Sequence, residues 1–478
     1  ALKRADLGPG LRMPRPPAAT VPDLLALLSA GEPVPAAWLV QRLGVTRPVL
    51  ARLVAEAGAQ VLRVGRARAT AYVARASTDA GSAWPLRRLR PDATLEELGT
   101  LYALRGERFQ FVPEGDRPNL VRPVEGRAGH FPGLPWFLDD QRPQGFLGRT
   151  LAHRQGPALG VPDDLNRWQL RDTLLAITRT GGTGIGDLLL GQAAVDAALA
   201  EVVAPVDAVP AEARPARYAQ WAQAALAGEE IGSSPGGEQP KFTATVTTPA
   251  GRHAVLVKFA VPDEGQAARR WADLLACEHL ALECLREAGL PASVSELVDA
   301  GGYTCLEVRR FDRSPDVLGR CGFVSLLALD AAFDGQGARD WSLAGERLAA
   351  DGWITAATAA QMARLYWFGR LIGNSDMHAG NLGFHLVDAG PLALAPAYDM
   401  LPMSLAPSRT GAVREAAPLR PEAPDRVGQF PHVAVAAQAA IGFWERVAGS
   451  GRIESAALRR LALLNRDVVA RFAKALGS

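Results

Sequence analysis

The feature that most constrains this chain is a polar loop at Gly373–Asn381, followed by two short apolar runs and then by Tyr398 and Asp399. Kinases use such an arrangement for phosphoryl transfer: one carboxylate accepts the proton of the attacking hydroxyl, while an amide and a second carboxylate hold magnesium. The pattern therefore predicts Asp376 as the catalytic base and Asn381 and Asp399 as Mg²⁺ ligands. ATP is the expected phosphate donor.

The segments around this loop predict that it joins a buried helix to a hairpin. Apolar residues recur at helical spacing up to the loop, at Met362, Leu365, Phe368 and Ile372. The runs Leu382–Val387 and Leu392–Tyr398 are joined by Asp-Ala-Gly-Pro, which is typical of a turn, so the second run would return the chain to the loop. Asn, Asp and Gly are also ordinary turn formers, so the loop alone does not exclude a simple turn.

A glycine-rich segment at residues 231–241 predicts the other half of a nucleotide site. It leads into an alternating strand, Phe242–Thr248, a turn at 249–252 and a second strand, His253–Ala260, an order typical of a hairpin. Glycine lets backbone amides approach phosphate oxygens closely. The spacing is not that of a Walker A loop. The alternative interpretation of this segment is a flexible linker.

Lysine usage favours phosphate binding over the linker. Of the 52 Lys and Arg residues, only Lys3, Lys241, Lys258 and Lys474 are lysine. One of these ends the glycine-rich segment and another lies in the second strand of the predicted hairpin. Both are positions where a compact ammonium suits phosphate oxygens better than a planar guanidinium.

One acidic residue, Glu278, lies in the apolar stripe of a helix predicted over 266–288. The apolar members of the stripe are Trp271, Leu274, Leu275, Leu282 and Leu285. A carboxylate among apolar side chains is costly unless it is paired, and Lys258 is the expected partner. Kinases use such a pair to place the lysine on the α and β phosphates. The alternative is that Glu278 lies at the solvated edge of the stripe.

In order and spacing these motifs resemble those of the HipA-type serine/threonine kinases, the toxin kinases of bacterial toxin–antitoxin systems. The resemblance covers residues 141–478 and rests on the segments Ser234–Lys241, Lys258, Glu278, Arg310–Arg313, Asn374–Asn381 and Tyr398–Asp399. It implies an ATP- and Mg²⁺-dependent protein kinase. The residues it implies at the nucleotide are Ser234, Gly236, Gly237, Gln239, Lys241, Lys258, Glu278, Phe311 and His378.

The same resemblance implies partners and a form of self-regulation. Family members phosphorylate a serine of their own glycine loop, and Ser234, with its neighbour Ser233, occupies the matching position. Known members often act on an aminoacyl-tRNA synthetase, so a protein substrate of that kind is a candidate, as is an antitoxin. The sequence departs from the family at Gly380, where members commonly carry lysine. The loss of that charge removes one stabiliser of the transferring group.

The N-terminal segment, residues 21–78, predicts a winged helix-turn-helix. The expected elements are a packing helix at Leu24–Leu28, helices at 35–43 and 46–57, and strands at Gln60–Val64 and Ala69–Arg75. Gly44 would form the turn between the second and third helices, and Thr46 would cap the third. Fusion of such a domain to a HipA-like kinase resembles the YjjJ-like branch of the family.

Positive charge is concentrated in this segment. From Pro35 to Thr78 there are seven arginines and one acidic residue, a net charge of +6, whereas the whole chain is +2. Such charge suits double-stranded DNA. The candidate DNA contacts are Thr46, Arg47 and Arg52 on the third helix and Arg63, Arg66 and Arg68 on the wing. A protein-docking role for the winged helix remains the alternative.

The expected fold class is α+β: a winged helix-turn-helix, then a two-lobed kinase-like fold with a mostly helical C-terminal lobe. The expected parts are a disordered segment at 1–20, the winged helix at 21–78, a linker at 77–91, an accessory part at 92–230, a nucleotide-binding lobe at 231–320 and a helical catalytic lobe at 321–478. The cysteines show no Cys-x-x-Cys spacing and are expected as buried thiols. No apolar run approaches the about 20 residues of a membrane span, and no signal segment is evident, so a cytoplasmic protein without a membrane partner is expected.

Three functions are compatible with these patterns. The favoured one is a serine/threonine protein kinase that also binds DNA and phosphorylates its own glycine loop. The first alternative is a DNA-binding transcription regulator whose degenerate kinase fold only senses nucleotide. The second is a small-molecule phosphotransferase of the aminoglycoside phosphotransferase kind, which uses the same Asp, Asn and metal-Asp chemistry.

Overall fold

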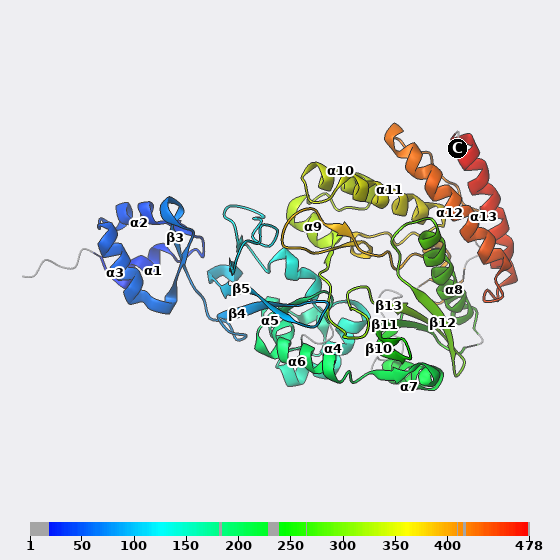
Figure 1. Cartoon of the computed structure of the whole chain (residues 1–478), viewed down its shortest axis with the longest axis horizontal. Coiled ribbons are helices and arrows are strands. Elements are labelled where there is room, and N and C mark those ends of the chain that lie inside the picture. Colours follow the sequence, from blue (N-terminus) through cyan, green and yellow to red (C-terminus); the bar gives the residue numbers. More distant parts are fainter. Residues whose placement is uncertain are drawn as a thin grey trace, which may run out of the picture.

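The computed structural model of the chain describes residues 19–180, 184–227, 239–263, 265–408, 410–413 and 417–476. The expected phosphate-loop residues Ser233, Ser234, Gly236 and Gly237 lie outside the described residues, as does nearly all of the segment 1–20 expected to be disordered. The described part has mixed α and β structure. It is elongated, with the N-terminal domain (19–75) at one end and the helices α12 (Phe430–Gly449) and α13 (Ala456–Ala475) at the other (Figure 1).

The N-terminal domain contains the predicted helices and strands. They are α1 (Val21–Leu27), β1 (Val34–Pro35), α2 (Ala36–Leu43), α3 (Arg47–Ala57), β2 (Val61–Val64) and β3 (Ala71–Ala74), with an antiparallel sheet in the order β1-β3-β2. The helices bury Leu24, Leu39 and Leu50 together. Gly44 ends α2 with φ of 65°, a left-handed conformation that glycine adopts without strain. The predicted cap of α3 is incomplete, because the Thr46 hydroxyl accepts no hydrogen bond from the first turn of this fully described helix.

The middle domain (83–203) is a five-stranded antiparallel sheet with helices. Its elements are β4 (Ala83–Leu89), β5 (Leu95–Ala103), β6 (Phe109–Pro113), β7 (His130–Phe131), the 3₁₀-helix η4 (Trp136–Gln141), α4 (Gly145–Leu159), α5 (Leu170–Arg179), β8 (Leu188–Leu190) and α6 (Gln192–Val203), and the strand order is β7-β6-β5-β4-β8. The prediction of a linker at 77–91 was wrong, because β4 is an inner strand of this sheet. Buried Trp84 and Leu86 alternate with less buried neighbours, but an irregularity after Leu86 moves the next buried position to Leu89, so the sequence shows no sustained strand pattern.

The sheet lobe (208–309) carries the predicted lysine hairpin and the predicted long helix. Its elements are β9 (Ala208–Pro210), α7 (Arg214–Ala227), β10 (Lys241–Thr248), β11 (Gly251–Ala260), α8 (Gln266–Glu287), β12 (Ser295–Ala300) and β13 (Tyr303–Arg309), in the strand order β12-β13-β11-β10-β9. The β9 strand and α7 lie within the segment expected as an accessory part, yet α7 buries Tyr218 and Ala222 with β10 and β11 in one core.

The helical lobe (324–476) holds the predicted loop between a buried helix and a hairpin. Its elements are β14 (Val324–Ser325), α9 (Leu326–Phe333), α10 (Trp341–Ala350), α11 (Ala356–Leu371), the 3₁₀-helix η7 (Ala379–Asn381), β15 (Gly383–His385), β16 (Ala393–Leu394), α12 and α13. Figure 1 shows α9, α10 and α11 above the sheets and α12 and α13 at the C-terminal end. The chain leaves α11 at Gly373, whose φ of 74° is again left-handed.

Two further features of the described residues complete the fold. None of their helices is both long and apolar enough to span a bilayer. Cys277, Cys284 and Cys305 are buried free thiols, as expected, and Cys321 is a partly buried one.

Candidate active site

The loop after α11 is a closed turn that presents Asp376. The Asp376 backbone N–H donates to Asn374 Oδ1 at 3.0 Å, and Asn381 Nδ2 donates to the Asp376 carbonyl at 2.9 Å. These bonds hold the backbone on both sides of Asp376, while its carboxylate is exposed. A short Asn or Asp turn of this kind is what the sequence favours.

The same loop is tied to the segment that carries Asp399. Asn374 Nδ2 donates to the Asp399 carbonyl at 3.3 Å, and the Tyr398 hydroxyl donates to the Gly380 carbonyl at 2.7 Å. Asp399 has φ of 52°, which is uncommon for a residue other than glycine and persists where surrounding contacts enforce it. Asn374 and Tyr398 belong to the quoted motifs, but their positioning roles were not predicted.

Lys258 lies between two carboxylates at the centre of the site. Its Nζ is 2.7 Å from both Glu278 carboxylate oxygens and is also paired with Asp399 Oδ1. The Asp399 backbone N–H donates to Glu278 Oε1 at 3.2 Å. The predicted Lys258–Glu278 pair is therefore present, and Glu278 is buried rather than at a solvated edge.

The charges in this group stabilise one another against burial. Burial alone lowers the pKa of Lys258, but the Asp399 and Glu278 carboxylates more than offset it, so its pKa is raised above the ordinary value. Burial raises the pKa of Glu278. Burial also acts to raise the pKa of Asp399, but Lys258 and Lys241 outweigh it and hold that pKa below its usual range. The lysine is therefore charged, and Asp399 is anionic at neutral pH.

The second predicted lysine, Lys241, lies directly opposite Lys258 in the β10–β11 pair. Cross-strand partners share one face of a sheet, so both side chains point to the same side. Two like charges in direct opposition are unfavourable unless anions lie nearby. Gln239, just before β10, donates from its side chain to the Phe259 carbonyl and so fixes the start of this strand.

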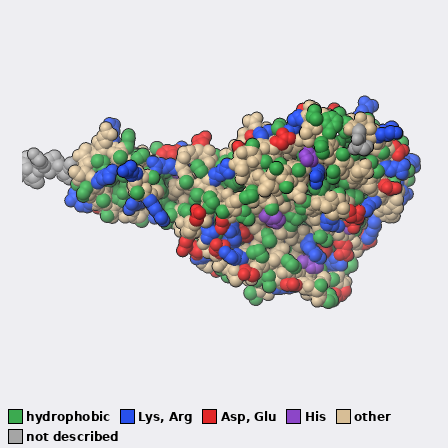
Figure 2. Space-filling view, turned by 45° about the horizontal axis from the view of Figure 1, so that its top comes forward, with side chains coloured by type: hydrophobic (Ala, Val, Ile, Leu, Met, Phe, Trp, Pro, Cys, Tyr) green, Lys and Arg blue, Asp and Glu red, His purple; other side chains and the backbone are tan. Residues whose placement is uncertain are grey.

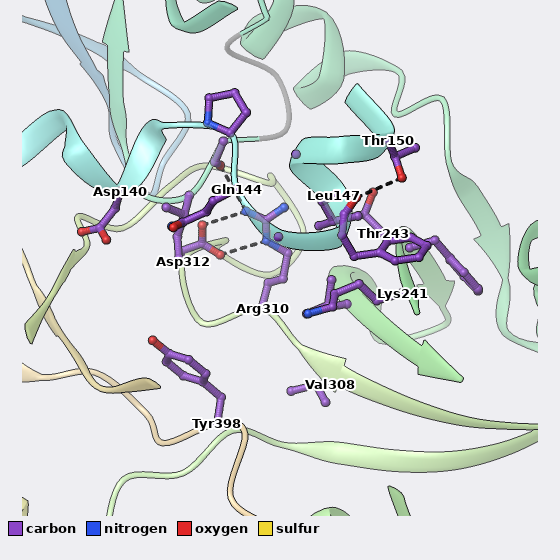
Figure 3. A pocket seen from close by; sticks show the side chains of 18 of the residues that line it. Asp140, Gln144, Leu147, Thr150, Lys241, Thr243, Val308, Arg310, Asp312 and Tyr398 are labelled. Atoms are coloured by element: carbon purple, nitrogen blue, oxygen red, sulfur yellow. Dashed lines mark hydrogen bonds and ion pairs between the residues drawn. The ribbon is translucent and has the colours of Figure 1, made fainter. Parts of the chain in front are cut away.

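The residues predicted for catalysis, nucleotide binding and metal binding that the structure describes converge on one cleft of about 1040 Å³. Its lining includes Gln239, Lys241, Lys258, Glu278, Phe311, Asp376, His378, Asn381 and Asp399. The middle domain lines it as well, through Asp140, which precedes α4, and through Gln144 and Leu147 at the start of that helix (Figure 3).

His378 and Gly380 are joined by a hydrogen bond within the loop that follows Asp376. His378 Nδ1 accepts from the Gly380 backbone N–H at 3.0 Å, so the ring caps η7. A Cβ at position 380 would lie 2.9 Å from ring atoms of His378. Any side chain there, including the lysine common in the family, would displace this ring.

Phe311 belongs to an aromatic cluster behind the site. It stacks on Tyr398 with ring centroids 5.8 Å apart and contacts Phe323 at 5.6 Å. Beside it, the buried Asp312 accepts from Arg313 and, as Figure 3 shows, from Arg310. Sequence reasoning did not predict a role for this charge cluster.

The donor set suits a magnesium nucleotide. Mg²⁺ in kinase sites is held by one or two protein oxygens together with phosphates and water. Asp399 would supply an anionic oxygen, and because Asn381 Nδ2 donates to the Asp376 carbonyl, the Oδ1 atom of Asn381 is the one that could bind a metal ion. The described residues hold no group of three or more His, Cys, Asp or Glu side chains placed so that they could bind a metal ion. Two facing lysines supply positive charge for phosphates.

The predicted DNA contacts lie far from this cleft in the fold, on the N-terminal domain. Thr46, Arg47, Arg52, Arg63, Arg66 and Arg68 are all exposed. They occupy the start and outer face of α3 and the β2–β3 strand pair with its connection. Figure 2 shows Lys and Arg side chains spread over this domain, where acidic side chains are scarce.

Comparison with known proteins agrees with this organisation. The model of the YjjJ-like toxin middle domain matches residues 80–199, and the model of the HipA-like C-terminal domain matches residues 233–461. Toxin YjjJ of Escherichia coli strain K12 is 39% identical over 398 residues, which cover 83% of this chain and 86% of that protein.

Two solved structures show more distant likeness. HipA of the Shewanella oneidensis MR-1 toxin–antitoxin system, solved with HipB and its operator DNA, matches with a TM-score of 0.45 and 13% identity, covering 82% of this chain and 95% of that chain. The proinflammatory kinase CtkA of Helicobacter pylori matches with a TM-score of 0.33 and 12% identity, covering 49% and 95%. On the strength of the two domain models and the Escherichia coli relative, the chain belongs to the HipA-type toxin family, in its YjjJ-like branch.

Proposed function

We propose that the protein is an ATP- and Mg²⁺-dependent serine/threonine protein kinase. The observation that carries this proposal is the convergence of Asp376, Asn381, Asp399 and the Lys258–Glu278 pair on one cleft, from four separate parts of the sequence. Membership of the HipA-type toxin family supports the same reaction class.

Each side chain has a role in this reaction that follows from its position. The Asp376 carboxylate accepts the proton of a substrate hydroxyl while the hydroxyl oxygen bonds to the γ-phosphorus and the bond to ADP breaks. Lys258, oriented by Glu278, binds the phosphates, and Lys241 adds a second positive charge. When bound, Mg²⁺ held by Asn381 and Asp399 neutralises charge on the nucleotide phosphates. Asn374 holds the Asp376 loop against the Asp399 backbone through its side-chain hydrogen bonds.

The N-terminal domain is the proposed DNA-binding part. Its order of three helices and a three-stranded antiparallel sheet supports a winged helix-turn-helix. Arg47 and Arg52 would contact the major groove or its phosphates, and Arg63, Arg66 and Arg68 the flanking backbone. The net charge of +6 between Pro35 and Thr78 supports DNA rather than a protein as the partner of this domain.

Autophosphorylation at Ser234 or Ser233 and a protein substrate complete the proposal. The glycine loop leads directly into Gln239 and Lys241, which line the cleft. A phosphate on that loop would add negative charge beside the lysines that bind the nucleotide, and so would switch the kinase off. A translation factor such as an aminoacyl-tRNA synthetase is the candidate substrate, and an antitoxin is a candidate partner.

Incubation of the purified full chain with labelled ATP and Mg²⁺ tests the proposal. We expect phosphate on Ser233 or Ser234, and we expect the Asp376→Asn variant to lose about 10²- to 10⁴-fold of the rate, as removal of a general base does. The exposed Asp351→Asn, at the end of α10, is the control. ATP binding without transfer in the wild-type chain would favour a nucleotide-sensing regulator, and transfer only to metabolites would favour a small-molecule phosphotransferase.

A further inference from the structure

We propose that the middle domain positions the catalytic hairpin, so that Asn119, Arg117 and Arg88 are positioning residues of the active site. The hairpin is β15, β16 and the turn 386–392 between them. Its first strand begins two residues after Asn381 and its second ends five residues before Asp399. The kinetic part of this inference rests on the proposed kinase activity, and the structural part does not.

Asn119 forms hydrogen bonds to the backbone of the turn. Its Nδ2 donates to the Val387 carbonyl at 2.9 Å and to the Gly390 carbonyl at 3.0 Å. Its backbone N–H donates to the Asp388 carbonyl at 2.9 Å. The side chain is 8% exposed, so these bonds form largely away from water, where unpaired carbonyls are costly.

Two arginines of the same domain hold the side chain of the turn. Arg117 pairs with Asp388 Oδ2 and, through its other terminal nitrogen, with Glu96 at 2.9 Å. Arg88 on β4 lies 2.9 Å from Asp388 Oδ1 and 2.6 Å from Asp187. The Asp388 carboxylate is thus held at both oxygens by guanidinium groups that the middle-domain sheet fixes in turn.

The hairpin has little pairing between its own two strands because it is short. Its strands are paired only at Phe384 with Leu394 and at His385 with Ala393. A two-stranded hairpin is marginal by itself in water. On its other edge β15 pairs with β14, and there too the middle domain takes part: Asp140 Oδ2 accepts from the Ser325 backbone N–H at 2.7 Å. Within its own lobe the hairpin is held by β14 and by the bond from the Leu392 backbone N–H to the Trp353 carbonyl at 2.7 Å. The middle domain adds the contacts at 387–390 of the turn and, through Asp140, the contact at the base.

The test compares full-chain variants by hydrogen exchange and by kinetics. Asn119→Ala removes the two side-chain bonds. Asn119→Asp keeps the shape, cannot donate to the carbonyls when ionised, and adds a negative charge near Asp388. The matched control is Arg87→Ala, because Arg87 neighbours Arg88 on β4 but pairs with Glu97 and Gln192 inside the middle domain.

We expect backbone exchange across 382–394 to be faster by about tenfold in Asn119→Ala and by more in Asn119→Asp, with α12 unchanged. We expect kcat to fall by about tenfold to a hundredfold with KM for ATP within about twofold, since small displacements of catalytic groups slow the reaction without removing nucleotide contacts. Arg87→Ala should change neither quantity.

The outcomes separate this inference from the proposed function. Wild-type exchange across 382–394 in both Asn119 variants would overturn the inference, whatever the kinetics. Faster exchange there with an unchanged kcat would also overturn it, because loosening the hairpin would then have no effect on the reaction rate. If the wild-type chain transfers no phosphate, the proposed function fails, and the exchange experiment still decides whether the middle domain holds the hairpin.

Discussion

At the scale of single residues, the site is organised around a buried ammonium shared by two carboxylates. Lys258 is 5% exposed and Glu278 is 1% exposed, so water does little to stabilise either charge. A buried charge without its partner is strongly unfavourable, whereas the pair itself adds little net stability. The two carboxylates therefore serve to fix the position of Lys258 Nζ rather than to stabilise the fold.

Replacing Glu278 tests that view. We expect Glu278→Gln to lower the unfolding free energy by about 3 kcal/mol, at the lower end for a broken buried pair because Asp399 still faces Lys258. We also expect KM for ATP to rise, since Lys258 is no longer oriented. Urea unfolding and steady-state kinetics measure the two effects, with Glu283→Gln, a more exposed residue of the same helix, as the control. Unchanged stability would mean that Glu278 is not buried with Lys258.

At the scale of elements, the contact between η4 and the start of α9 makes the free energy of unfolding depend on pH. Burial raises the pKa of Asp140 to about 6, and hydrogen bonds from Ser325 only partly oppose it. The unfolded value is about 3.9, so between about pH 4 and pH 6 the folded chain keeps a proton that the unfolded chain has lost. The contribution of this group to the unfolding free energy therefore falls as pH rises through that window. Above the window the full cost of burying the ionised carboxylate is present.

Asp140→Asn should remove this penalty while keeping an oxygen that accepts from Ser325. We expect the variant to be more stable than the wild type by about 1–2 kcal/mol at pH 8, below the linkage limit because the side chain is partly exposed, and by much less at pH 4.5. Chemical denaturation at the two pH values measures the difference, and Asp163→Asn at an exposed position of the same domain is the control. An equal gain at both pH values would contradict the assignment to ionisation.

At the scale of the whole molecule, charge is divided between the parts. The N-terminal domain is strongly basic while the chain as a whole is almost neutral, and the domain lies at one end of the elongated molecule (Figure 1). It joins the middle domain through few charged contacts, such as Glu32 with Arg108 at 2.7 Å. DNA binding and phosphoryl transfer are thus expected to be separable by mutation.

Arg52→Ala is expected to weaken binding to duplex DNA and to reduce the slope of log K against log salt by about 1, because one phosphate contact is lost. Phosphoryl transfer should not change. Arg105→Ala, which removes the same charge from an exposed position in the middle domain, should leave DNA affinity near the wild-type value. Fluorescence anisotropy over a salt series measures both. Equal losses in the two variants would indicate that net charge alone, rather than α3, attracts the DNA.

Some of this protein follows from local sequence. The helix that carries Glu278, the lysine hairpin and the loop that ends at Asn381 were predicted and are present, because each depends on periodicity or on turn residues within about 20 positions. The burial of Glu278 beside Lys258 was also predicted, since an acidic residue in an apolar stripe requires a partner. The family was recognisable because these motifs occur in order.

Only the tertiary structure decided how the middle domain relates to the site. The β4 strand was mistaken for a linker, and Asn119 and Arg117 lie about 270 positions from the turn they hold, with no local pattern to mark them. Asp140 enters the cleft from the same domain for the same reason. Periodicity reports which face of an element is buried, but not which distant element buries it. That pairing depends on the free energy of the whole packed chain, to which residues remote in sequence contribute together.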